Sequence, residues 1–71
     1  MKVIEKKPCI IQGQCLLLVA DDSMRKFNVM SAPCDIDVNP NKEVDWSKTT
    51  PYYIRMVDGE KARGLYECLT Q

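Results

Sequence analysis

The chain contains no histidine, and this absence removes a large part of enzyme chemistry. A Ser-His-Asp or Cys-His nucleophile and a metal site with imidazole ligands both need that side chain. Carboxylate, lysine or tyrosine chemistry remains available, but a chain of 71 residues has little room for a pocket that excludes water. We therefore expect a protein that is not an enzyme and that carries no cofactor.

The chain also lacks an excess of charge, because 10 Lys and Arg are balanced by 10 Asp and Glu. Proteins that coat nucleic acids or membranes depend on surplus basic side chains, so both roles are disfavoured. The longest apolar run, Leu16 to Ala20, is far too short to span a bilayer. Charged residues fill the N-terminal stretch where a signal peptide is apolar, which predicts a cytoplasmic location and reduced thiols.

What is present is the composition of an ordinary globular domain, with 45% hydrophobic and 28% charged residues. The length allows a single domain over residues 1–71, and no repeat or linker divides it. Four prolines separate segments that mostly have strand patterns. We predict a mainly β fold, a small twisted antiparallel sheet or small barrel of about four or five strands.

Strand patterns recur along the chain between the prolines. Residues 9–20 are typical of one long strand that a bulge or turn interrupts near Gly13, because glycine tolerates the bend. Residues 26–32 alternate and predict another strand. The sequence YYIRMV at 52–57 is the clearest strand, because it is rich in aromatic and β-branched residues. Residues 39–51 are predicted to form a long polar loop.

One short segment alternates apolar and acidic side chains more strictly than the rest. Cys34, Ile36 and Val38 would share one face of a strand, and Asp35 and Asp37 would share the other. The two carboxylates then either form a solvated strand face that opposes aggregation, or steer a basic partner protein toward the surface.

The last residues fit two different structures. Residues 64–69 can form a final strand, which is the structure that we predict. However, Ala62, Leu65, Tyr66 and Leu69 also fall at helical spacing behind an N-cap at Asp58. Gly64 would cost such a helix about 1 kcal/mol relative to alanine. The alternative is therefore an α+β fold with a C-terminal helix at about 60–70.

The four cysteines offer a weak metal pattern. The closest pair, Cys9 and Cys15, lies six positions apart, whereas zinc ligands usually come in pairs two to four residues apart. We expect Cys34 and Cys68 to be small buried apolar residues. The alternatives are a disulfide such as Cys9–Cys15, or a zinc-stabilised domain held by Cys9, Cys15, Cys34 and Cys68.

Aromatic residues give the best indication of a contact surface, because Trp and Tyr are enriched where proteins bind each other. Trp46 lies in a polar loop, so it either folds back onto the sheet or contacts a partner. Tyr52 and Tyr53 would point to opposite faces of one strand. The predicted partner-contact residues are Trp46, Tyr52, Tyr53, Asp35, Asp37 and Arg55.

These patterns favour a small protein–protein interaction module that acts by surface complementarity. A domain of this size gains stability from a second copy, so a homo-oligomer is a natural first partner. It also suits an accessory or inhibitory protein of the phage or mobile-element type. The alternative is a small barrel that binds single-stranded nucleic acid through Tyr53 and five basic residues: Arg25, Lys26, Arg55, Lys61 and Arg63.

Overall fold

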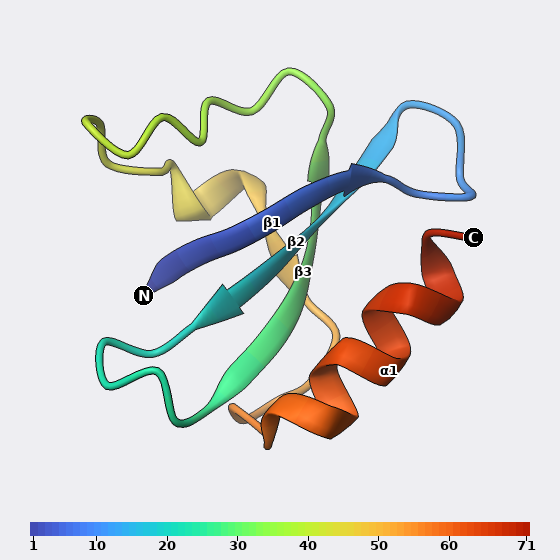
Figure 1. The fold of residues 1–71 in the computed structure, drawn as a ribbon. Helices are drawn as coiled ribbons and strands as arrows, with labels where there is room; N and C mark the ends of the chain where they lie inside the picture. The colour runs from blue at the N-terminus through green and yellow to red at the C-terminus, as the bar shows by residue number, and fades with distance from the viewer.

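Four strands form one antiparallel sheet in the order β1-β2-β3-β4, and a C-terminal helix packs against one face of it (Figure 1). The computed structural model describes residues 1–71. The element bounds are β1 Lys2–Pro8, β2 Gln14–Ala20, β3 Phe27–Pro33, a 3-10 helix η1 Trp46–Lys48, β4 Thr50–Pro51 and α1 Gly59–Leu69.

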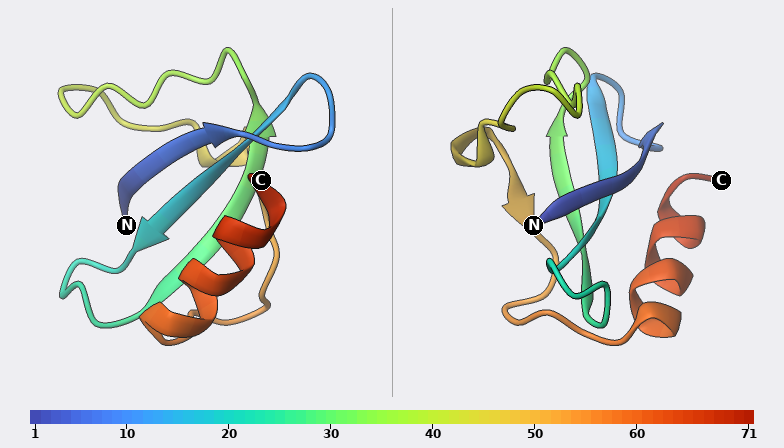
Figure 2. Two further views of the ribbon diagram at one scale, coloured as in Figure 1. Left: turned by 45° about the vertical axis from the view of Figure 1, so that its right-hand side comes forward. Right: turned by 60° about the vertical axis from the view of Figure 1, so that its left-hand side comes forward.

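Strand β2 is buried on both faces, and the core is built around it. Its residues Cys15 to Ala20 are all buried, which is why the sequence shows a continuous apolar run instead of alternation. Leu16 and Leu18 point toward helix α1, while Leu17 and Val19 point toward the loop that joins β3 to β4. Figure 2 shows the helix and this loop on opposite sides of the sheet.

Helix α1 replaces the strand that we predicted at residues 64–69, so that prediction is wrong and the α+β alternative is confirmed. The Asp58 carboxylate accepts a hydrogen bond from the Lys61 amide at 2.9 Å and caps the first turn. Ala62 and Tyr66 are fully buried against the sheet. Burial of that stripe outweighs the cost of Gly64, which has open space around it.

The second face of the sheet is covered by a loop, and this corrects the strand that we predicted at residues 34–38. The chain turns directly after Pro33, and the Ile36 amide donates to the Pro33 carbonyl at 3.1 Å. Ile36 is buried, as the alternation required, but Cys34 is exposed. The Lys6 ammonium donates to the carbonyls of Cys34 and Ile36 at 2.8 and 3.2 Å, and so fastens the loop to β1.

A bulge in β1 supplies apolar residues to both layers of the core. Val3 pairs with Val19 and Glu5 pairs with Leu18, which leaves Ile4 as the extra residue. Val3 packs against the cluster on the loop side of the sheet, and Ile4 packs against the cluster on the helix side. The buried residues of the loop-side cluster are Leu17, Val19, Met30, Ala32 and Ile36, and those of the helix-side cluster are Leu16, Leu18, Val29, Ala62 and Tyr66.

The strand predicted over residues 9–20 is wrong in its first part, because residues 9–13 are not strand but form the turn between β1 and β2. Gly13 has a positive φ of 82°, a conformation that favours glycine.

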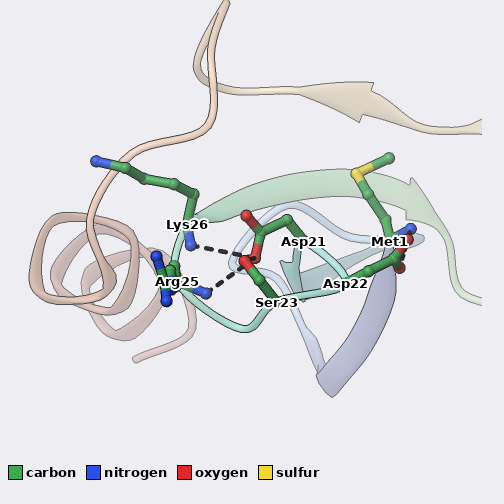
Figure 3. Close-up of polar contacts among 6 residues, drawn as sticks. All are labelled: Met1, Asp21, Asp22, Ser23, Arg25 and Lys26. Carbon is green, nitrogen blue, oxygen red and sulfur yellow. Dashed lines mark hydrogen bonds and ion pairs between the residues drawn. The ribbon is translucent and has the colours of Figure 1, made fainter.

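The turn between β2 and β3 is organised by a single carboxylate (Figure 3). Oδ1 of Asp21 accepts hydrogen bonds from the Ser23 hydroxyl at 3.1 Å and from the amides of Arg25 and Lys26 at 2.9 and 3.3 Å. Partial desolvation acts to raise the pKa of Asp21, but these hydrogen bonds outweigh it and lower the pKa. The turn leads into β3, which begins at Phe27, one residue after the predicted start at residue 26.

Helix α1 has 11 residues, and the molecule contains no helix with the length and apolar character that crossing a bilayer requires.

The buried hydroxyl of Tyr66 generates the first prediction, because it has no hydrogen-bond partner. Removing an unsatisfied buried hydroxyl while keeping the ring removes its desolvation cost, so we expect Tyr66→Phe to raise the free energy of unfolding by about 1 kcal/mol. Tyr66→Ala should lower it by about 3–5 kcal/mol, because it leaves a cavity. Urea denaturation of the three proteins measures both effects. A Phe variant less stable than the parent would contradict the assignment.

The same residue predicts a loss of stability at alkaline pH. Burial raises the pKa of Tyr66 from 10.0 to about 12, and the Glu5 carboxylate adds to the shift. The unfolded chain therefore loses this proton first, and the stability that depends on it is lost as the pH rises through this window. The slope is about 1.4 kcal/mol per pH unit. Denaturation curves at several pH values should show this slope in the parent and a shallower one in Tyr66→Phe.

Candidate interaction surface

The chain after β4 is held against the sheet by one side chain, the buried amide of Asn28. Its Nδ2 donates to the Tyr53 carbonyl at 3.0 Å, and its Oδ1 accepts from the amides of Tyr53 and Val29 at 3.3 and 2.7 Å. The Asn28 amide thus takes the place of a backbone strand partner for Tyr53. No sequence pattern indicated this role.

The strand that we predicted at 52–57 is therefore wrong in its extent. Only Thr50 and Pro51 pair with β3, and Val57 forms an isolated bridge with Phe27. Between them the backbone bends, because the Asn28 side chain occupies the position of a neighbouring strand backbone. Residues 52–55, hereafter the 52–55 segment, lie on this bend.

Large side chains of the 52–55 segment project into solvent. Ile54 is fully exposed, at 101% of its reference accessibility, and Tyr52 is 42% exposed. Arg55 is exposed and forms no ion pair within the molecule. The Tyr52 amide donates to the Val29 carbonyl at 2.9 Å, so the start of the segment is anchored as well. The sequence indicates Tyr52 and Arg55 as contact residues here but not Ile54, because an apolar residue in this run is equally typical of a buried strand face.

Tyr53 faces helix α1. It is half-buried, and the Lys61 ammonium lies 5.4 Å from the centre of its ring. The Tyr53 hydroxyl donates to the Lys61 carbonyl at 3.5 Å. The two neighbouring tyrosines therefore differ: the ring of Tyr53 carries a lysine of its own chain, whereas Tyr52 is exposed.

Trp46 begins the 3-10 helix η1 and packs against the loop-side cluster, with part of its ring still accessible. Asp45 caps this helix, because its carboxylate accepts from the Ser47 amide and hydroxyl. The Ser47 hydroxyl, more than any other group, lowers the pKa of Asp45. Trp46 thus belongs to the loop-side cluster, against which Met56 also packs.

Asp35 and Asp37 are both exposed, but they lie in the turn after β3 and not on one strand face. Oδ1 of Asp37 accepts from the Asn39 amide at 2.9 Å, and Oδ2 lies 3.5 Å from the Lys42 ammonium. The Asn39 hydrogen bond, aided by Lys42, lowers the pKa of Asp37. Asp37 therefore shapes the loop, and Asp35 is the carboxylate of this pair that is free of such bonds.

The four cysteines are free thiols in different environments. Cys15 is buried, Cys9 is half-buried, and Cys34 and Cys68 are exposed, so the predicted burial of the last two is wrong. Cys34 follows the end of β3, and Cys68 lies on the solvent side of α1. No group of three or more Cys, Asp or Glu side chains is placed to hold a metal ion. Burial raises the pKa of the Cys15 thiol, and the neighbouring Cys34 thiol adds to the effect.

A groove of about 500 Å³ lies between the start of β1 and the loop at residues 38–46. Its apolar lining includes Val3, Val38, Val44 and Trp46. The sequence did not indicate this groove, because the lysine-rich segment that forms β1 lacks the regular alternation of apolar and polar residues that is typical of a strand.

Comparison with protein-family models, with curated protein sequences and with solved structures finds no match to this chain.

The Asn28 clamp predicts a local and a global effect of one substitution. Asn28→Ala leaves the Tyr53 backbone groups without partners, so the free energy of unfolding should fall by about 1–3 kcal/mol. Hydrogen exchange of the Tyr53 amide should accelerate more than that of β2 amides. Asn41→Ala is the matched control, because Asn41 is exposed and its side chain makes no hydrogen bond. Equal stability of the two variants would contradict the clamp.

Thiol exposure predicts an order of alkylation. In native protein, iodoacetamide should modify Cys34 and Cys68 at least about tenfold faster than Cys15, because Cys15 is buried with a raised pKa. Peptide mass spectrometry over a time course measures each site, and urea-unfolded protein is the control in which the difference disappears. Protection of Cys34 and Cys68 that is lost on adding a chelator would instead support the zinc alternative.

Proposed function

We propose that this chain is a small, non-enzymatic protein–protein interaction module, with the 52–55 segment at the centre of its contact surface. The observation that carries the proposal is the complete exposure of Ile54 on a backbone that Asn28 holds in place. Exposed apolar and aromatic side chains that are grouped on one segment, as Tyr52 and Ile54 are here, are candidates for a binding site. A cytoplasmic location remains part of the proposal, on the sequence grounds given above.

The backbone of the 52–55 segment is preorganised for binding. Binding a partner costs free energy for every chain segment that it must order. Here the backbone amide of Tyr52 and both backbone groups of Tyr53 are already fixed, so little backbone ordering remains. Burying Ile54 against a partner removes apolar area from water, and Tyr52 and Arg55 beside it are residue types enriched at interface hot spots.

The structure gives less support to the nucleic-acid alternative. Base stacking needs an open aromatic face, and the Lys61 ammonium already lies over the Tyr53 ring. The exposed Tyr52 lies next to Ile54, an apolar side chain that a phosphate backbone does not favour.

The proposal predicts that Ile54 is a contact residue. A photo-crosslinking amino acid at position 54, in cells that make the protein, should give a discrete crosslinked species of higher mass. The same probe at position 11 is the matched control, because Ile11 is an exposed isoleucine in the β1–β2 turn. Once the crosslinked partner is identified by mass spectrometry, Ile54→Asp should weaken its binding by about thirtyfold or more. Ile11→Asp should leave binding unchanged.

A species that contains only this chain would show that the partner is a second copy. Equal crosslinking from both positions, or unchanged affinity of Ile54→Asp, would refute the contact surface.

A further inference from the structure

The groove between β1 and the loop at 38–46 is a second surface, separate from the 52–55 segment. Its volume of about 500 Å³ is within the range of ligand sites. Val3, Val44 and Trp46 give it an apolar floor that is continuous with the loop-side core, since all three pack against the buried cluster. A bound side chain would therefore rest on a rigid base.

One wall of the groove is the start of β1, which is an edge strand. In the sheet order β1-β2-β3-β4, β1 has β2 as its sole neighbour. The backbone hydrogen bonds outside the strand ladders and the helix include none from residues 2–8. The outer edge of β1 thus presents unpaired N–H and C=O groups, which are the groups that an added strand binds.

The basic side chains at this edge favour an added strand that is acidic. Strand β1 carries Lys2, Lys6 and Lys7 against a single acidic residue, Glu5. Lys2 lines the groove, whereas the Lys6 ammonium binds loop carbonyls and the Lys7 ammonium lies over the Tyr66 ring. The charged side chains in the groove lining are Lys2, Lys42 and Glu43, and the Lys42 ammonium lies 3.5 Å from Asp37. In full-length antiparallel pairing with a second copy of β1, Glu5 would lie directly opposite Glu5, and this like-charge pair disfavours a second copy at this edge.

We propose that the groove binds an extended acidic peptide segment of a partner protein, which adds to the edge of β1 as a fifth strand. Alternate apolar side chains of the peptide rest on Val3, Val44 and Trp46. Its carboxylates lie near Lys2 and Lys42. Backbone hydrogen bonds to β1 supply sequence-independent affinity, while the groove floor and the lysines select apolar and acidic residues. This site does not depend on the 52–55 segment.

The test is a titration of isotope-labelled protein with a seven-residue probe, acetyl-EVEVEVE-amide, followed by amide NMR up to about 1 mM peptide. We expect shifts confined to β1 and residues 38–46, and slower hydrogen exchange in β1. The basic peptide acetyl-KVKVKVK-amide should not bind. Two methylated versions of the acidic probe test strand pairing, each carrying N-methyl groups on one of the two alternate sets of backbone nitrogens. Only the version methylated on the nitrogens that face β1 should lose binding, because an added strand pairs through one of its edges.

Charge reversals identify the site on the protein. Lys2→Glu and Lys42→Glu should each weaken the acidic probe by about threefold to tenfold. Lys26→Glu is the matched control, because Lys26 is an exposed lysine in the β2–β3 turn, and it should have no effect. Ile54→Asp should also bind the probe normally, so a failure of this site is distinguishable from a failure of the 52–55 segment.

The proposal would be overturned by equal binding of the basic peptide, by tolerance of both methylation patterns, by shifts centred on residues 52–55, or by the absence of binding at the highest concentration. Octanoate serves as a small-molecule comparison. If it binds the groove while the acidic peptide does not, the site takes a small amphipathic anion and strand addition is refuted. Self-association through β1, detected by sedimentation, would likewise assign the edge to a second copy.

Discussion

The burial of β2 on both faces is the constraint on which the rest of this structure depends. Six consecutive residues, Cys15 to Ala20, are withdrawn from water, so each face needs its own cover. The chain of 71 residues has one α-helix, α1, and this helix covers one face of the sheet. The other face is covered by an irregular loop whose apolar side chains, Ile36 and Trp46 among them, are spaced along a polar sequence.

The irregular loop that covers this face has no strand ladder to hold it, and it is held in place by hydrogen bonds from side chains. The Lys6 ammonium binds two carbonyls of the loop, and the carboxylates of Asp37 and Asp45 fix its local turns. The Asn28 amide holds the chain that returns from the loop toward the helix. Both surfaces that we propose as partner sites lie beside this loop or in the chain that follows it. Their rigidity therefore comes from side-chain hydrogen bonds more than from strand ladders.

The sequence predicted the elements whose signals are local. The strand near residues 26–32 and the Asp58 cap each depend on neighbouring residues, and each is present. The errors come from tertiary context. The alternation at 34–38 and the aromatic run at 52–57 are typical of strands, but the chain turns after Pro33, and the Asn28 side chain takes the place of a strand partner for Tyr53. The Asn28 side chain hydrogen-bonds to a backbone 25 residues away, and such a contact leaves no periodic pattern in the sequence. For the same reason the sequence identified Tyr52 and Arg55 but neither Ile54 nor the groove.

The bulge at Ile4 has a consequence for any chain that pairs with β1. In a regular strand, side chains alternate between the two faces without interruption, so a partner of any length stays in phase with it. Here Ile4 and Glu5 both oppose Leu18, and the alternation of β1 changes phase between Val3 and Lys6. A partner matched to one side of the bulge is out of phase on the other side. The bulge therefore confines a regularly alternating partner to one part of β1, and it opposes open-ended growth of the sheet from one molecule to the next.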